Sequence, residues 1–148
     1  MPEEYGPCSF VLDVYAYSPS LRQIERDVTV FARSADIGVR VTSRLRTCRQ
    51  QEDLYRQGKT RIPPTYSQHE FGWAFDVVPT SGYQAYGATF REAVEWLAAL
   101  GLYFGAGTGL AESDHAHVAY WAPENWRRLT YARDVGAWMP VPGRRRQG

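Results

Sequence analysis

The segment from Ser67 to Asp76, which reads Ser-Gln-His-Glu-Phe-Gly-Trp-Ala-Phe-Asp, constrains this chain more than any other. It places an imidazole and a carboxylate close together in sequence, with one glycine and several apolar residues between them. The chain has three histidines, and the other two, His115 and His117, lie together in a second acidic segment. A single metal ion held by both segments would explain this distribution. Zinc is the first candidate because it favours nitrogen ligands supplemented by a carboxylate.

A catalytic zinc takes three protein ligands and keeps a fourth position for water. His69 and Asp76 would supply one imidazole and one carboxylate, and one of the two late histidines would supply the third ligand. Either Glu112 or Asp114 would then remain as a general base. Gly72 fits this interpretation, because a backbone that wraps around a metal often needs a positive φ or a close approach.

The spacing Ser67-x-His69-x-x-Gly72-x-Ala74-x-Asp76 resembles the first signature of the M15 zinc metallopeptidases. This family includes D-alanyl-D-alanine carboxypeptidases and dipeptidases, and phage L-alanyl-D-glutamate endolysins, all with the hedgehog/DD-peptidase fold. The resemblance extends upstream to the segment Thr42–Arg46 and to Gln51, Leu54, Tyr55 and Gly58, so that it covers about residues 40 to 121.

The resemblance implies that His69 and Asp76 bind zinc and that Arg46 lies near the substrate. Arginine suits that role because its planar, permanently charged fork binds a carboxylate or an oxyanion in a bidentate manner. Ser67 is expected to orient the loop or a ligand through a hydrogen bond.

The second signature of the family is an acidic residue three positions before the last ligand histidine, and two pairs in this chain satisfy it. We assign His117 as the ligand and Asp114 as the base, because an apolar strand follows His117 as it does in the family. The pair Glu112 and His115 is the alternative. In an extended chain His115 and His117 share a face, so His115 is expected beside the site, in contact with a ligand or the substrate.

These residues predict a zinc peptidase that cleaves the stem peptide of bacterial peptidoglycan. The first hypothesis is an endolysin-like L-alanyl-D-glutamate endopeptidase, and the alternative is a D,D-carboxypeptidase or D-Ala-D-Ala dipeptidase. A non-catalytic module that holds a structural zinc and binds the wall or a protein is the competing class. In that case His115 would close the site as a fourth ligand.

The order of the elements predicts an α+β fold, with helices packed on one side of a small antiparallel sheet. The expected helices run from Pro19, after an N-cap at Ser18, to about Ala35, over 50–57, over 89–100 with a stop at Gly101, and from Pro123 to about Ala132. The expected strands cover 39–43, 74–78 and 117–121, and residues 9–17 are expected to form a strand or an extended segment. The segments 59–66, 81–87 and 105–109 are expected as loops. One domain is predicted over 1–148, with an uncertain extension at 1–17 and a flexible tail at 140–148.

Composition and charge exclude several other classes of protein. The formal net charge of +1 gives no global field for nucleic acid, and no apolar run approaches the length of a membrane span. No signal peptide is predicted, so we expect synthesis in the cytoplasm and release to the wall by another route. A phage or prophage origin is compatible with this expectation. Cys8 and Cys48 are expected as reduced thiols, although one bridge between them is possible. A monomer is expected.

Overall fold

The computed structural model describes residue 8 and residues 16–119, with the side chain of Thr108 left aside. These residues fall into two compact units. The first contains residues 45–72, with Cys8 and Ala16, and the second contains residues 17–44 and 73–119. Most of the segment expected to be extended over 9–17 lies outside the described residues, as do the helix expected from Pro123 and the tail expected over 140–148.

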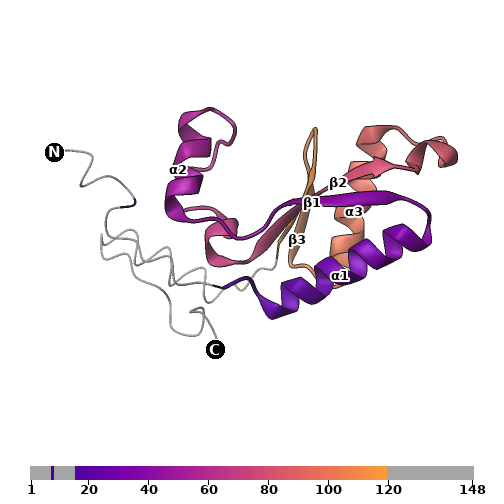
Figure 1. Ribbon diagram of the computed structural model, residues 1–148, viewed down its shortest axis with the longest axis horizontal. Coiled ribbons are helices and arrows are strands. Elements are labelled where there is room, and N and C mark those ends of the chain that lie inside the picture. Colours follow the sequence, from indigo (N-terminus) through magenta and orange to yellow (C-terminus); the bar gives the residue numbers. More distant parts are fainter. Residues whose placement is uncertain (1–7, 9–15, 120–148) are drawn as a thin grey trace. The chain divides into compact units, whose positions relative to one another are not determined.

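The second unit is built on a four-stranded antiparallel sheet with the strand order β1-β2-β4-β3 (Figure 1). The strands are β1 (Gly38–Ser43), β2 (Ala74–Ser81), β3 (Thr108–Ala111) and β4 (Ala116–Ala119). The predicted strands over 39–43 and 74–78 are therefore confirmed, and β4 begins one residue before the predicted start.

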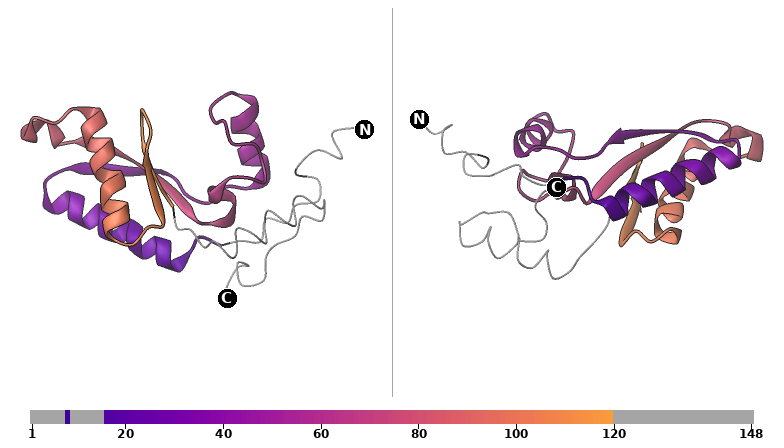
Figure 2. Two further views of the ribbon diagram at one scale, coloured as in Figure 1. Left: turned by 180° about the vertical axis from the view of Figure 1, so that it is seen from behind. Right: turned by 60° about the horizontal axis from the view of Figure 1, so that its bottom comes forward.

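Two helices, α1 (Pro19–Ser34) and α3 (Phe90–Tyr103), pack on the sheet of this unit (Figure 2). Ser18 is the N-cap of α1 as predicted, because its hydroxyl accepts a hydrogen bond of 3.2 Å from the backbone N–H of Leu21. Thr89 and Glu92 form a capping box at the start of α3. The starts of both helices therefore follow from local side-chain chemistry.

The alternation of side chains along the strands decides which face of the sheet carries polar groups. Phe75 and Val77 on β2 lie in the same core cluster as Val118 and Ala116 on β4, together with buried residues of α1 and α3. Because successive side chains of a strand point to opposite faces, Asp76 points away from the helices. The two helices cover one face, and the other face is left for polar residues.

Two expectations about α3 and the segment after it are wrong. Gly101 does not end α3, which continues to Tyr103. A Cβ on Gly101 would lie 2.6 Å from Cγ1 of the buried Val118, so this glycine allows the helix to approach β4 closely. The segment 105–109, expected as a flexible loop, contributes the start of β3, where a Cβ on Gly109 would lie 2.7 Å from the carbonyl oxygen of Ala98. Both glycines serve helix–sheet packing.

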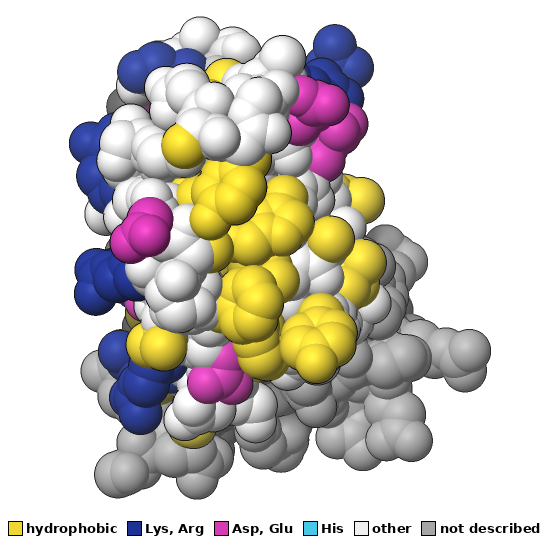
Figure 3. All heavy atoms as spheres, turned by 90° about the vertical axis from the view of Figure 1, so that its right-hand side faces the viewer, with side chains coloured by type: hydrophobic (Ala, Val, Ile, Leu, Met, Phe, Trp, Pro, Cys, Tyr) yellow, Lys and Arg dark blue, Asp and Glu magenta, His cyan; other side chains and the backbone are white. Residues whose placement is uncertain are grey.

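Aromatic residues of this unit reach the surface, and hydrophobic side chains gather on one face of the molecule (Figure 3). Phe31 of α1 contacts the rings of Trp96 and Phe104, at centroid distances of 6.2 and 5.9 Å. Tyr86, in the 3₁₀ helix η3 (Tyr83–Tyr86), donates a hydrogen bond of 2.7 Å to the carbonyl oxygen of Ala35. This hydrogen bond therefore holds η3 against the end of α1.

The first unit contains α2 (Cys48–Arg56) and the 3₁₀ helix η2 (Gln68–Phe71). Helix α2 begins two residues before the predicted start, because Thr47 forms a capping box with Gln50. Cys48 forms a disulfide bond with Cys8, with 5.6 Å between their Cα atoms. The expectation of two reduced thiols is therefore wrong, because a bridge across 40 positions depends on spatial proximity that the sequence alone does not reveal.

None of the helices within the described residues combines the length and apolar character that a membrane crossing requires.

Candidate metal site

His69 lies in the short turn η2, which its neighbours hold in place. The hydroxyl of Ser67 accepts a hydrogen bond of 3.2 Å from the backbone N–H of His69. The carboxylate of Glu70 accepts bonds of 2.9 and 3.0 Å from the backbone N–H groups of Thr65 and Ser67. Gly72 ends the turn in the left-handed region, at φ 72°. Ser67 is thus bonded to the turn that carries His69, and His69 is almost completely buried.

Asp76 and His117 come from neighbouring strands and lie directly opposite each other in the register of β2 and β4. An oxygen of the Asp76 carboxylate, Oδ1, lies 3.1 Å from Nδ1 of His117. Leu110 on β3 and Ser43 on β1 continue the same row across the sheet. The pair therefore occupies the face of the sheet that the helices leave open.

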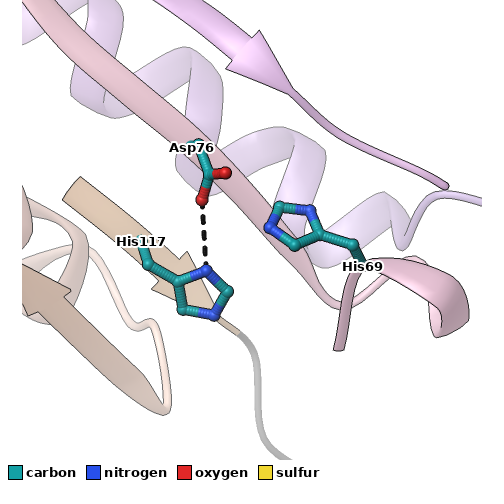
Figure 4. A group of neighbouring side chains, drawn as sticks. All are labelled: His69, Asp76 and His117. Carbon is teal, nitrogen blue, oxygen red and sulfur yellow. Dashed lines mark hydrogen bonds and ion pairs between the residues drawn. The ribbon is translucent and has the colours of Figure 1, made fainter. Parts of the chain in front are cut away.

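The three residues His69, Asp76 and His117 form a group that could hold a metal ion (Figure 4). Each offers one ligand atom, and these atoms all lie within 4.8 Å of one another. Two imidazole nitrogens and one carboxylate oxygen are a donor set found in catalytic zinc sites, which keep a fourth position open. The residues present therefore fit a zinc ion.

The acidic residues before His117 lie in the turn of the β3–β4 hairpin, which a backbone hydrogen bond of 2.8 Å from Glu112 to His115 closes. Asp114 is exposed, and its Oδ1 lies 2.7 Å from Nδ1 of His115. The other ring nitrogen of His115, Nε2, lies 3.8 Å from Oδ1 of Asp76. His115 thus lies beside the pair of Asp76 and His117, between it and the predicted base.

Arg46 lies in the first unit, and two contacts fix its position. Its backbone N–H donates a hydrogen bond of 3.1 Å to the carbonyl oxygen of His69. Its guanidinium Nη1 donates a bond of 2.9 Å to Oε1 of Gln51, whose Nε2 donates a bond of 2.8 Å to the carbonyl oxygen of Ile62. Arg46 is therefore linked to the turn that carries His69 and, through Gln51, to the loop after α2.

Sequence reasoning did not assign a role to Glu70 or to the fully buried Gln51, both of which hold loops in this unit. The signal for Glu70 was present, since Ser67 followed three residues later by Glu70 is a capping-box pattern. The signal for Gln51 was weaker. It shares the buried face of α2 with Cys48, and a buried polar side chain on such a face must find hydrogen-bond partners.

Comparison with known proteins reveals a similar fold. A scan against family models finds no match, and neither does a search of curated proteins. Among solved structures the chain is similar to the LdcB LD-carboxypeptidase, with a TM-score of 0.51 and 22% sequence identity over 84% of this chain and 73% of that chain. The likeness shows the fold. It confirms the α+β, hedgehog/DD-peptidase-like architecture that the sequence predicted. The LdcB structure itself reveals the molecular basis of peptidoglycan recognition.

Proposed function

We propose that the protein is a zinc-dependent peptidase of the M15 kind that hydrolyses a bond in the stem peptide of bacterial peptidoglycan. The observation that carries this proposal is the group His69, Asp76 and His117, whose candidate ligand atoms lie within 4.8 Å of one another. Two further observations support it. The segment with His69 and Asp76 resembles the M15 signature, and a solved structure of similar fold is a carboxypeptidase studied for its recognition of peptidoglycan.

The proposed chemistry needs a base, an acid and a group that stabilises negative charge. A bound zinc ion would supply a water with a pKa near 7 and would polarise a neighbouring carbonyl. Asp114 accepts the proton of the attacking water and later donates it to the leaving amine. Arg46 binds the carboxylate of the substrate or the developing oxyanion through its guanidinium. His115, bonded to Asp114, keeps that carboxylate oriented.

Two bonds of the stem peptide are candidates. The bond between L-Ala and D-Glu is the first, because the endolysin branch that the sequence resembles commonly has aspartate at the position of Asp114. The second candidate is the terminal peptide bond, which a carboxypeptidase cleaves. The likeness to the LdcB LD-carboxypeptidase favours this second candidate, as does the presence of Arg46, which suits a terminal carboxylate.

The disulfide bond between Cys8 and Cys48 supports a site of action outside the reducing cytoplasm, because such bonds persist in oxidising compartments. A peptidase that acts on the wall would work in such a compartment. The bridge thus agrees with a wall substrate.

Mass spectrometry of peptidoglycan digested by the zinc-loaded protein tests this proposal. A new D-Glu amino terminus identifies the endopeptidase, and a released terminal D-alanine identifies the carboxypeptidase. The zinc content of the same sample is measured in parallel, and a sample stripped with a chelator serves as the control. If a fully loaded sample leaves peptidoglycan uncut at neutral pH, the enzyme hypothesis is wrong and the non-catalytic, zinc-holding module takes its place.

A further inference from the structure

A second potential binding site lies in the first unit, between α2 and the loop that follows it. This hollow has a volume of about 480 Å³, within the range of small-molecule sites. Its walls come from residues three and four apart on α2 and from consecutive residues of the loop. They include Glu52, Tyr55, Arg56, Pro63, Pro64 and Tyr66. None of these residues has a role in the proposed hydrolysis.

The apolar part of the hollow is formed by two tyrosines and two prolines. Tyr55 is 45% exposed and Tyr66 is 43% exposed, so a substantial part of each side chain is open to a ligand. An aromatic ring carries negative charge on its face, which attracts the weakly positive C–H groups of a saturated ring. A tyrosine also offers a hydroxyl at its edge. This combination suits a ligand with one C–H-rich face and a polar rim, as a sugar ring has.

The polar part of the hollow is an ion pair on one turn of α2. Oε2 of Glu52 lies 3.1 Å from Nη2 of Arg56. The Glu52 side chain is 13% exposed, whereas the Arg56 side chain is 70% exposed. Glu52 can therefore accept a hydrogen bond from an N–H or O–H group within the hollow, and Arg56 can donate one to a carbonyl oxygen at its rim. An acetamido group, which has one N–H and one carbonyl, complements this pair.

The loop wall of the hollow is held in place before any ligand arrives. The buried Glu70 fixes the backbone N–H of Thr65 at 2.9 Å, and the buried Gln51 fixes the carbonyl oxygen of Ile62 at 2.8 Å. Thr65 lies in the left-handed region at φ 75°, which is rare for a β-branched residue and persists only where neighbouring contacts impose it. A wall fixed in this way binds a ligand at a lower entropic cost than a loose one.

We infer that this hollow is a subsite for an N-acetylated sugar of the glycan strand to which the stem peptide is attached. The inference rests on the proposed function. The same two side chains that hold the loop wall also join the candidate catalytic groups. Gln51 accepts a hydrogen bond from Arg46, and Glu70 follows His69 in the same turn. A sugar in the hollow and a peptide at Arg46 would therefore contact parts of one compact unit.

Binding of chitotriose, an N-acetylglucosamine trimer without peptide, tests the sugar subsite apart from hydrolysis. We expect NMR titration to show binding that Tyr55→Ala and Tyr66→Ala each weaken about tenfold or more. Arg56→Gln, an exposed change that leaves the fold intact, should weaken binding a few-fold. Tyr103→Ala is the matched control, because Tyr103 is 79% exposed and lies outside the hollow, and it should bind as the unmodified protein does. No binding, or binding unaffected by the Tyr55 and Tyr66 variants, overturns the inference.

A comparison of two substrates distinguishes a sugar subsite from a peptide subsite. Tyr55→Ala should raise KM for a stem peptide joined to its sugar and leave KM for the free stem peptide unchanged. An equal rise for both substrates overturns the sugar assignment in favour of a peptide subsite. If no sample hydrolyses either substrate although chitotriose still binds, the proposed function is contradicted and the sugar site is retained.

Discussion

Asp76 and His117 lie opposite each other on β2 and β4, with 3.1 Å between Oδ1 of the carboxylate and Nδ1 of the imidazole. The pairing register of two antiparallel strands fixes this relationship, and the side chains share the face that the helices leave open. A one-residue slip of β4 would turn His117 toward the core and bring Ala116 or Val118 to that face. The candidate metal site therefore depends on sheet register as much as on residue identity.

Removing the imidazole of His117 should remove the metal. We expect His117→Ala to weaken zinc binding by about a hundredfold or more, since even residues that merely support a ligand are worth 10–100-fold in affinity. Equilibrium dialysis with metal analysis measures this. His115→Ala is the matched control, because it removes the neighbouring imidazole and should retain zinc. If His115→Ala loses the metal and His117→Ala retains it, the alternative pair of Glu112 and His115 completes the site.

The two acidic residues of the hairpin turn should differ in their effect on the reaction. Asp114→Asn should retain zinc and lower kcat by about 10²–10⁴-fold, the usual contribution of a general acid–base. Glu112→Gln, which changes a nearby exposed carboxylate in the same turn, should leave kcat within a few-fold. Turnover of peptidoglycan by zinc-loaded samples measures both. A loss of activity confined to Glu112→Gln would shift the base by two residues.

The sequence predicted most of the sheet and the segment that carries His69 and Asp76, because both depend on short-range patterns. Leu21, Ile24 and Val28 recur at helical spacing and are buried in α1. Phe31 continues the same spacing, yet it is 43% exposed and contacts Trp96 and Phe104 at the surface. Periodicity therefore predicted the face of the helix, whereas the position of the partner elements decided where burial ends.

The features that sequence reasoning missed depend on contacts between distant residues. Gly101 resembles a helix stop in the sequence, although its role is the close approach to Val118. The four-residue strand β3 carries too few alternating apolar residues to be recognised, and its pairing with β4 defines the hairpin turn. The disulfide between Cys8 and Cys48 likewise joins residues whose proximity exists only in the folded chain.

Gly101→Ala tests the role of that glycine in packing. In an exposed helix this change would stabilise by about 1 kcal/mol. Here the added methyl group overlaps Cγ1 of Val118, a stiff and fully buried side chain, so we expect a net loss of about 1–3 kcal/mol in the free energy of unfolding. Ala99→Gly, at an exposed position of the same helix, should cost about 1 kcal/mol through helix propensity alone. Urea unfolding of both variants provides the comparison, and a stabilised Gly101→Ala protein would contradict this account of the packing.

The ion pair between Glu25 and Arg44 should make stability depend on pH. Nε and Nη2 of Arg44 donate hydrogen bonds of 2.8 and 2.7 Å to the carboxylate of Glu25, which also accepts a bond of 2.9 Å from the hydroxyl of Tyr17. Burial alone would raise the pKa of Glu25, but the hydrogen bonds from Arg44 and Tyr17, together with the charges of Arg44 and Arg22, outweigh it and lower the pKa below its ordinary value of 4.5. The folded state therefore binds this proton less readily than the unfolded state does. The resulting stability is present above pH 4.5 and is lost as the pH falls through the lowered pKa of the folded state.

Glu25→Gln removes this titration and weakens the pair. At pH 7 we expect the variant to be less stable by about 1–2 kcal/mol. This is the lower part of the range for hydrogen bonds to charged groups, because solvent screens the half-exposed Arg44. The difference should shrink as the pH is lowered toward 3, because the unmodified protein then protonates Glu25 and loses the same interaction. Urea unfolding of both proteins at several pH values measures the difference.

Glu95→Gln is the control, since Glu95 forms an exposed pair with Arg91 and should show little pH-dependent effect. A difference between Glu25→Gln and the unmodified protein that stays constant from pH 7 to pH 3 would mean that the carboxylate contributes through packing, and that its charge has no part in the stability of the fold.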